Sequence, residues 1–335
     1  MIRSLPRTSA PTDPPPRPGP PRAPLRRWLP LSWRRGRVVA ALAVTVALGM
    51  LILPHLPNRF GNLGSLAQTL LPWTGVAVPV LLLFALARRS AAAVTALTLP
   101  ALVWLSLHGH ALLDKERGRG DLTLVSHNVD SANPDPAGTA RRLAESGADV
   151  IALEELSPPA TPHYERALAA AYPHHAVMGT VGVWSKVPIS DTRAVPIMPW
   201  PRALRTTLHT PKGPVAVYVA HLASVRVLPS RGFTTDRRNE AADRLAHALS
   251  TEPLARTVLV GDLNGSADDR ALTSVTSGLR SAQDTAGNGF GFSWPAAFPV
   301  VRIDHILSRH LPATRSWTLP ATTSDHLPVA ASFDL

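Results

Sequence analysis

Three long apolar stretches without a charged residue occupy residues 38–53, 61–87 and 90–107. Since about 20 apolar residues cross a bilayer as a helix, the second and third stretches are long enough and the first is marginal. The first lacks a small-residue cleavage site before Pro54 and Pro57, which favours an uncleaved anchor over a signal peptide. We therefore predict three transmembrane helices. Three buried core helices are the less favoured alternative, because such helices normally carry a polar stripe.

After residue 121 the pattern changes to short β-branched runs separated by turns and helical segments. The predicted strands cover residues 122–126, 149–153, 181–185, 214–222, 257–261, 302–307 and 328–333. Helical patterns cover residues 138–145, 165–171 and 237–249. Strands interspersed with helices indicate an α/β domain over residues 122–335, joined to the apolar part by a linker at residues 108–121.

Charge is distributed unevenly along the chain. The net charge is +11, but residues 1–120 carry 15 Lys and Arg against 3 Asp and Glu, whereas residues 121–335 carry 19 against 20. The surplus therefore lies at the front, which includes a Pro- and Arg-rich tail at residues 1–37 that we expect to be unfolded. A duplex-binding domain needs its basic surface on the folded part, so we expect no nucleic-acid partner.

Arginines near the apolar stretches predict the membrane topology. Nine arginines precede the first stretch, only Arg59 lies between the first and second, and Arg88 and Arg89 lie between the second and third. This alternation predicts a multi-pass protein of the cell membrane with a cytoplasmic N-terminus and an extracytoplasmic α/β domain. Three basic residues within residues 115–119 argue weakly for the opposite orientation.

Polar side chains with oxygen or nitrogen ligands stand at the ends of most predicted strands. They are Asn128, Glu154, Glu155, His221, Asp262, Asn264, Asp304, Asp325 and His326. The chain has no cysteine, so any metal must be held by oxygen or nitrogen. Carboxylates, amides and imidazoles at one sheet edge predict a site for a hard cation with donors left for an anion.

Each of these residues also has an ordinary structural interpretation. Asn128 and the Gly-Asp-Leu-Asn run ending at Asn264 are common in turns. Because side chains alternate along a strand, only one of Glu154 and Glu155 can face the site, and the sequence does not say which. Asp268 and Asp269 fail the spacing of a calcium loop and are interpreted as a helix N-cap or surface charge.

Taken in order, SHNVD, ALEEL, AHL, GDLN, RIDHIL and SDHLPV resemble the endonuclease/exonuclease/phosphatase superfamily, the deoxyribonuclease-I-like metallophosphoesterases. The resemblance covers about residues 122–335. It implies a four-layer α/β sandwich with the site at one edge of two packed sheets. With three membrane helices in front, the whole chain also resembles the VanJ-type membrane proteins linked to teicoplanin resistance.

The superfamily resemblance implies a role for each matched residue and a magnesium cofactor, with manganese as a substitute. Glu155 matches the metal-binding glutamate, with Asn128 beside it and Asp325 completing the metal side. Asp262 and Asn264 match the pair that positions the attacking water and the phosphate. The other matches are His221, which faces the phosphate, and Asp304, which orients His326. Either His326 or Asp262 could be the base.

A phosphoesterase on the outer membrane face is well placed for a lipid phosphate in the bilayer. The closer resemblance implies hydrolysis of undecaprenyl diphosphate and recycling of the cell-wall carrier lipid. The alternatives are an extracellular nuclease or phospholipase C-like diesterase, and a catalytically silent protein that binds a wall precursor or glycopeptide. Four arginines after His221 either hold a second phosphate or form a solvated loop and helix start. They are Arg226, Arg231, Arg237 and Arg238.

Overall fold

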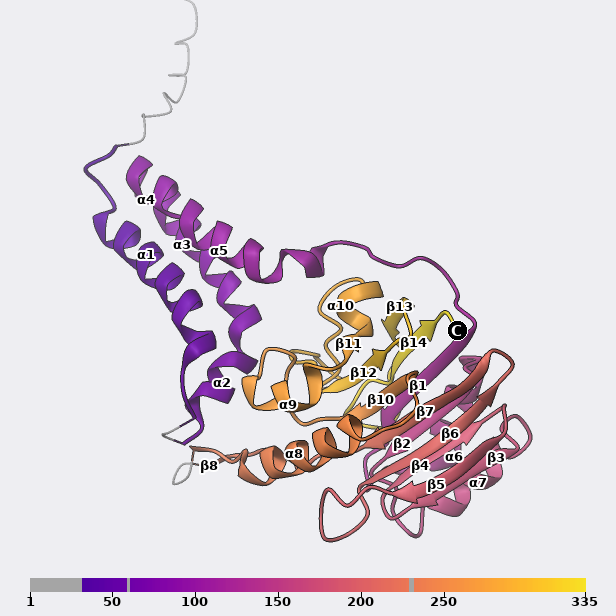
Figure 1. The fold of residues 1–335 in the computed structure, drawn as a ribbon. Coiled ribbons are helices and arrows are strands. Elements are labelled where there is room, and N and C mark those ends of the chain that lie inside the picture. Colours follow the sequence, from indigo (N-terminus) through magenta and orange to yellow (C-terminus); the bar gives the residue numbers. More distant parts are fainter. Residues whose placement is uncertain (1–31, 59–60, 229–231) are drawn as a thin grey trace, which may run out of the picture.

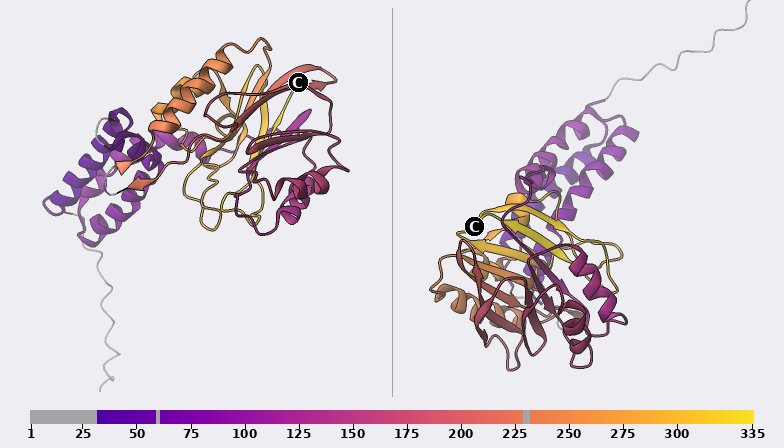
Figure 2. Two further views of the ribbon diagram at one scale, coloured as in Figure 1. Left: turned by 90° about the horizontal axis from the view of Figure 1, so that it is seen from below. Right: turned by 90° about the vertical axis from the view of Figure 1, so that its right-hand side faces the viewer.

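A computed structural model describes residues 32–58, 61–228 and 232–335. Most of the predicted tail, residues 1–31, lies outside the described residues, as do Arg59 and Arg231. The structure has two parts, a helical bundle and an α/β domain. The bundle stands to one side of the domain in each view (Figure 1 and Figure 2).

The bundle forms from the apolar stretches. Its elements are α1 (Arg37–Ile52), η1 (Leu53–His55), α2 (Leu63–Thr69), η2 (Leu71–Val76), α3 (Ala77–Ala87), α4 (Ala91–Ala96), α5 (Thr98–His108) and η3 (Gly109–Leu112). Within the described residues, two helical segments are long and apolar enough to cross a membrane, Arg37–His55 and Ala91–Leu112. Only 17% and 22% of their most apolar windows is buried, so most of their side chains face away from the protein. Such exposed apolar surface is typical of helices that contact lipid.

The middle apolar stretch is bent rather than straight. α2 and the helical run Leu71–Ala87 meet at an angle of 57°, and they are long enough to span a membrane only when taken together. Pro72 stands in the first turn of η2, where its ring prevents the preceding helix from continuing. The structure therefore gives two straight candidate spans and one bent pair, not three equivalent transmembrane helices.

The α/β domain contains two six-stranded mixed sheets. The first has the order β13 (Ala313–Thr318), β14 (Val329–Phe333), β1 (Leu122–Asn128), β2 (Val150–Glu154), β4 (Val181–Ser185), β3 (His174–Met178). The second has the order β11 (Arg280–Ser281), β12 (Asp304–Arg309), β10 (Thr257–Asp262), β7 (Gly213–Ala220), β6 (Ala203–Thr210), β5 (Ile189–Ala194). A separate short hairpin pairs β8 (Val227–Leu228) with β9 (Gly232–Phe233).

Three apolar cores hold these layers together. One lies between the sheets and contains side chains such as Leu124 and Val260. The second packs the first sheet against α6 (Pro136–Glu145) and α7 (Thr161–Leu168). The third packs the second sheet against α8 (Asp236–Ser250) and α9 (Thr273–Thr276). The remaining elements are η4 (Arg270–Leu272) and α10 (Ala282–Ala286). The α/β prediction is thus confirmed, with helices flanking both sheets.

The bundle docks on the α/β domain through polar side chains of α2. The Ser65 hydroxyl donates to Asp269 Oδ1 at 2.9 Å, and Gln68 Oε1 accepts from the backbone N–H of Arg270 at 2.9 Å. Asp269 is buried and also accepts from Arg238 at 2.6 Å and from the N–H of Ala271 at 3.0 Å. Asp269 therefore caps η4, which is one of the two predicted alternatives. It is buried where the bundle meets the α/β domain, so it is not a surface charge.

The start of α1 and the loop between α3 and α4 lie at the end of the bundle that is remote from the α/β domain (Figure 1), and both segments are rich in arginine. There the N–H of Ser32 donates to the carbonyl of Arg89 at 2.8 Å, and the Ser90 hydroxyl donates to the carbonyl of Arg35. These contacts bring the residues before α1 and the loop between α3 and α4 to the same end. The arginines at this end are Arg34, Arg35, Arg37, Arg88 and Arg89.

Removing the Asp269 carboxylate should destabilise the protein strongly. Asp269→Ala leaves the fully buried Arg238 without its counterion, so the free energy of unfolding should fall by about 3 kcal/mol. Asp268→Ala, the matched control next to it, should change stability by less than about 1 kcal/mol. Thermal unfolding in detergent measures both, and equal midpoints for the two variants would contradict this role of Asp269.

Candidate active site

Polar side chains converge where β1, β2, β7 and β10 end and where β12 begins. The strand register causes this, because Asn128 of β1 lies beside Glu154 of β2, and Asp262 of β10 lies opposite Asp304 of β12. The loop before β14 joins the same edge, where the Ser324 hydroxyl donates to the carbonyl of Asn128 at 2.7 Å. The side chains brought together are Asn128, Glu155, His221, Asp262, Asp304 and His326.

Asn128 connects the two sheets at this edge. Its amide nitrogen donates to Asp262 Oδ2 at 3.0 Å and to Glu155 Oε1 at 3.2 Å. One amide group therefore holds two carboxylates at a fixed spacing.

The structure distinguishes the two adjacent glutamates. Glu154 ends β2 with its side chain fully buried, where Oε1 accepts from the Ser126 hydroxyl at 2.9 Å. Burial, together with the nearby charge of Asp304, raises the pKa of Glu154 well above its usual value. Glu155 follows with a φ of 60°, a left-handed conformation that is rare for glutamate, and lines the central cavity. Glu155, not Glu154, is thus the carboxylate available to a metal.

Asp262 and Asn264 form a compact turn after β10. The N–H of Asn264 donates to Asp262 Oδ1 at 2.8 Å, and its side-chain amide donates to the carbonyl of Leu222 at 3.1 Å. Asn264 adopts a φ of 47°, which asparagine tolerates better than most residues. Burial and the neighbouring charge of Asp304 raise the pKa of Asp262 to about 7. Asp262 can therefore exchange a proton near neutral pH.

Asp304 and His326 form a buried ion pair. His326 Nδ1 lies 2.9 Å from Asp304 Oδ2, which also accepts from the Ser293 hydroxyl at 2.6 Å. Burial lowers the pKa of His326, but the charge and hydrogen bond of Asp304 outweigh it and raise the pKa to about 10. Burial likewise raises the pKa of Asp304, yet His326 brings it below its usual value. In the absence of a metal, the pair is therefore imidazolium and carboxylate at neutral pH.

His221 stays neutral beside an arginine that sequence reasoning missed. Burial, followed by the charges of Arg202 and His326, lowers the pKa of His221 well below its usual value. Arg202 Nη2 lies 2.6 Å from His221 Nδ1, and Arg202 Nε donates to the His221 carbonyl at 3.1 Å. His221 Nε2 lies 3.5 Å from Glu155 Oε1. Arg202 directly precedes β6, a strand that the sequence analysis did not predict, so no sequence signal pointed to this arginine.

The remaining predicted residues lie at the margin or elsewhere. Asp325 lines the mouth of the cavity, accepts from Trp294 Nε1 at 3.0 Å, and has 59% of its side chain exposed. Arg226 is exposed on the loop after β7. Arg238 is fully buried and its Nη2 donates to Asp269 at 2.6 Å, so a phosphate entering from solvent cannot reach its guanidinium. The position of Arg238 therefore does not allow the predicted role in holding a second phosphate.

The residues present fit a divalent cation. One atom each of Asp262, Asp304 and His326 lies within 4.8 Å of the others, and the two carboxylate oxygens are the available ligands while His326 stays protonated. Asp304 Oδ1 is buried without a hydrogen-bond partner among the described residues, which is unusual for a carboxylate oxygen. With Glu155 and Asn128 alongside, the donors are mainly oxygens, the ligands that hard cations such as Mg²⁺ prefer.

A cavity of about 520 Å³ opens over these groups. Its polar floor includes Glu155, Asp262 and His326. Its walls are apolar and come partly from the helical bundle. They include Leu66, Thr69 and Leu70 of α2, Val227 and Phe233 of the hairpin, and Val300. The bundle therefore forms part of the wall of the candidate active-site cavity.

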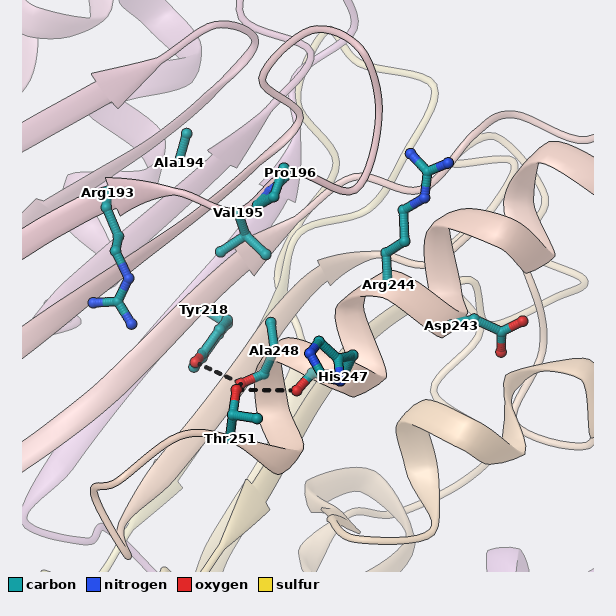
Figure 3. Close-up of a pocket in the computed structure, with 10 residues that line it drawn as sticks. All are labelled: Arg193, Ala194, Val195, Pro196, Tyr218, Asp243, Arg244, His247, Ala248 and Thr251. Atoms are coloured by element: carbon teal, nitrogen blue, oxygen red, sulfur yellow. Dashed lines mark hydrogen bonds between the residues drawn. The ribbon is translucent and has the colours of Figure 1, made fainter.

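A second hollow of about 550 Å³ lies between α8 and the end of β5 (Figure 3). It contains Arg193, Arg244 and His247, whereas Tyr218 at its base belongs to the core between α8 and the second sheet. None of the converging carboxylates lines it. It is therefore separate from the candidate active site.

The sequence profile of the Endonuclease/Exonuclease/phosphatase family matches residues 125–326. This match covers more than half of the chain and every strand end that contributes to the cavity floor. The chain belongs to this family. No curated protein matches the chain.

Solved structures share the fold of the α/β domain. A mannosyl-6-phosphatase of Bacteroides thetaiotaomicron is 15% identical with a TM-score of 0.52, and the match covers 64% of this chain and 100% of that one. A humanised TDP2 of D. rerio is 18% identical with a TM-score of 0.53, covering 64% and 99%. Beta toxin of Staphylococcus aureus is 15% identical with a TM-score of 0.51, covering 63% and 99%. Family members of this kind are hydrolases of phosphoesters, which fits the chemistry of the site.

Replacing Asp304 should lower the pKa of His326 in metal-free protein. Because folding raises this pKa, the stability it contributes is complete below the ordinary value of 6.5 and is lost as the pH rises through about 10. Asp304→Asn should therefore move the imidazole titration to lower pH and remove this contribution. NMR titration of the imidazole in the presence of a chelator measures the change.

Asp325→Asn provides the matched control for this titration. Asp325 Oδ1 lies 3.9 Å from His326 Nε2, and the side chain is mostly exposed, so solvent weakens its effect. The shift should be much smaller than that of Asp304→Asn. Equal shifts in the two variants would refute a dominant Asp304–His326 pair.

Proposed function

We propose that this protein is a membrane-anchored, metal-dependent phosphoesterase that hydrolyses undecaprenyl diphosphate, or a related lipid phosphate, on the outer membrane face. The shared cavity carries the proposal, because the same hollow contains the catalytic carboxylates and the apolar side chains of α2. A phosphate attached to a hydrocarbon chain presents both kinds of surface at once. This activity would recycle the cell-wall carrier lipid and thereby support teicoplanin resistance.

The chemistry follows from the charges at the cavity floor. Water adds to the terminal phosphorus while the bond to the bridging oxygen breaks, and negative charge moves onto the leaving phosphate. A magnesium ion, or manganese in its place, held by Glu155 and Asn128 with Asp325 on the same side, would neutralise the phosphate oxygens. Asn264 lines the same cavity and places its side-chain amide beside Asp262, and Arg202 positions His221 behind the floor.

Asp262 and His326 are suited to different roles in proton transfer. His326 is already protonated at neutral pH because its pKa is raised to about 10, so it suits stabilisation of negative charge. Asp262, with a pKa of about 7, suits acceptance of the proton from the attacking water. We therefore propose Asp262 as the base and His326, oriented by Asp304, as the cationic partner.

The arginines of the bundle support the proposed orientation. Five of them lie at the end remote from the α/β domain, which positive charge would hold in the cytoplasm. The α/β domain, docked at the opposite end through α2, would then lie outside the cell. A lipid bilayer and a lipid-linked phosphate are the partners that follow from this placement.

A diesterase acting on nucleic acid is the second candidate, because one similar structure is a TDP2 of D. rerio complexed with single strand DNA product, with a TM-score of 0.52. The net charge of −1 on residues 121–335 disfavours a polyanionic nucleic acid, since 19 basic residues meet 20 acidic ones there. A silent protein binding a wall precursor is disfavoured by the complete set of catalytic groups.

Purified protein should release phosphate from undecaprenyl diphosphate only when a divalent cation is present, and it should leave DNA and sphingomyelin intact. Asp262→Asn should lower kcat by about a thousandfold, because it removes the proton acceptor. Asp243→Asn, an exposed change on α8, is the matched control and should be neutral. Cleavage of DNA or sphingomyelin in preference to the lipid would overturn the substrate assignment.

Reporter fusions should establish the orientation. An alkaline phosphatase fused after Leu335 should be active, because that enzyme folds only outside the cytoplasm. The same reporter fused after Arg89, which ends the remote loop, should be inactive. The reverse result would place the α/β domain in the cytoplasm and exclude an extracytoplasmic lipid substrate.

A further inference from the structure

An aromatic pocket of about 320 Å³ lies between the bundle and the α/β domain, next to the catalytic cavity. The bundle contributes Trp73 and Val76 from η2 and Trp104 from α5, and the domain contributes Phe290 and Phe292. None of these residues belongs to the candidate active site. The family profile begins at residue 125, so the part of the pocket that the bundle forms lies outside the profile.

The pocket walls are packed as a continuous aromatic surface. Phe290 and Phe292 stack with ring centroids 5.1 Å apart, and Trp73 stacks on Phe292 at 5.8 Å. Trp104 lies against Phe290 at 6.2 Å. A side chain at position 75 would collide with the Trp104 indole, so Gly75 lets η2 and α5 of the bundle approach closely behind this surface. The domain and the bundle thus build one site together.

The chemistry of the lining selects a hydrocarbon occupant. Both indole N–H groups are already used within the protein, since Trp73 donates to the carbonyl of Val300 at 2.7 Å and Trp104 to that of Pro72 at 2.9 Å. The other side chains that line the pocket offer no polar atom. A polar ligand would lose its hydration here without gaining a hydrogen bond, whereas an apolar chain would gain by burial.

The pocket also adjoins the catalytic cavity. Val300 lines that cavity and is bound by Trp73, which lines the pocket. Along the chain, Leu70 lines the cavity and Pro72 lines the pocket, on either side of the bend between α2 and η2. A chain attached to a phosphate on the cavity floor would therefore pass the apolar wall of α2 and reach the pocket.

We propose that the pocket formed by Trp73, Val76, Trp104, Phe290 and Phe292 binds the polyprenyl chain of the substrate and makes the enzyme select for chain length. This inference rests on the proposed function for its substrate. A short chain would fill only the catalytic cavity, whereas a long chain would continue into the pocket. Selectivity should therefore lie in KM, because the pocket does not contact the reacting phosphate.

Filling the pocket tests the proposal. Val76 is 50% exposed, so Val76→Trp can occupy the pocket without disturbing a core. It should raise KM for undecaprenyl diphosphate by about tenfold, because part of the polyprenyl chain of the substrate is no longer buried. KM for farnesyl diphosphate and both kcat values should stay unchanged, which also shows that the variant is folded. Val80→Trp, at a valine with 44% exposure that does not line the pocket, is the matched control.

A binding measurement separates this proposal from the proposed function. Undecaprenol, which has no phosphate, should bind metal-free protein, and Val76→Trp should weaken that binding while Val80→Trp does not. If wild-type protein hydrolyses neither diphosphate but the alcohol binds in this way, the proposed function fails and the pocket assignment stands. Equal effects of Val76→Trp on the long and short diphosphates would overturn the pocket assignment. Equally strong competition by a phospholipid for undecaprenol binding would also overturn it.

Discussion

Two carboxylates, Asp262 and Asp304, are buried opposite each other in neighbouring strands, and the site is built around offsetting their repulsion. His326 supplies a positive charge to one, and Asn128 donates a hydrogen bond to the other. A divalent cation would supply the remaining charge. Because buried like charges cost free energy unless they are compensated, the sheet edge is stable only with these partners in place. The same pairing separates the two carboxyl groups, because the pKa of Asp304 is lowered by His326 whereas that of Asp262 is raised by burial and by Asp304.

The helical bundle takes part in this arrangement because of one bend. Pro72 turns the chain between α2 and η2, so α2 lies on the α/β domain instead of continuing a membrane span. Ser65 and Gln68 hold it there by hydrogen bonds to Asp269 and to the backbone of Arg270. Two polar residues within an apolar stretch thus hold α2 where its apolar side chains form a wall of the candidate active-site cavity.

The sequence predicted most of the site because its residues stand at strand ends. Parallel pairing of β1 with β2, and of β7 with β10, brings such ends to one edge whatever the details of packing. In the two sheets, β3, β5, β6, β11 and β13 were not predicted; β3 and β5 lie at edges, where their partly exposed, mixed side chains lack a clear alternation. Arg202 and the burial of Arg238 could not be foreseen, since both depend on contacts between segments distant along the chain. The bend at Leu70 was hidden by uniform hydrophobicity, although Pro72 was a signal for it.

Because α2 docks on the α/β domain, the N-terminal part of this protein is more than a tether. A simple tether can be cut without altering the enzyme it carries. Here Leu66 and Leu70 are part of the cavity surface, and Trp73 contacts the cavity wall at Val300. A fragment starting at residue 122 would retain every polar group of the candidate site but would lack the cavity wall that α2 forms. The substrate preferences of such a fragment would describe a different enzyme from the one that carries the bundle.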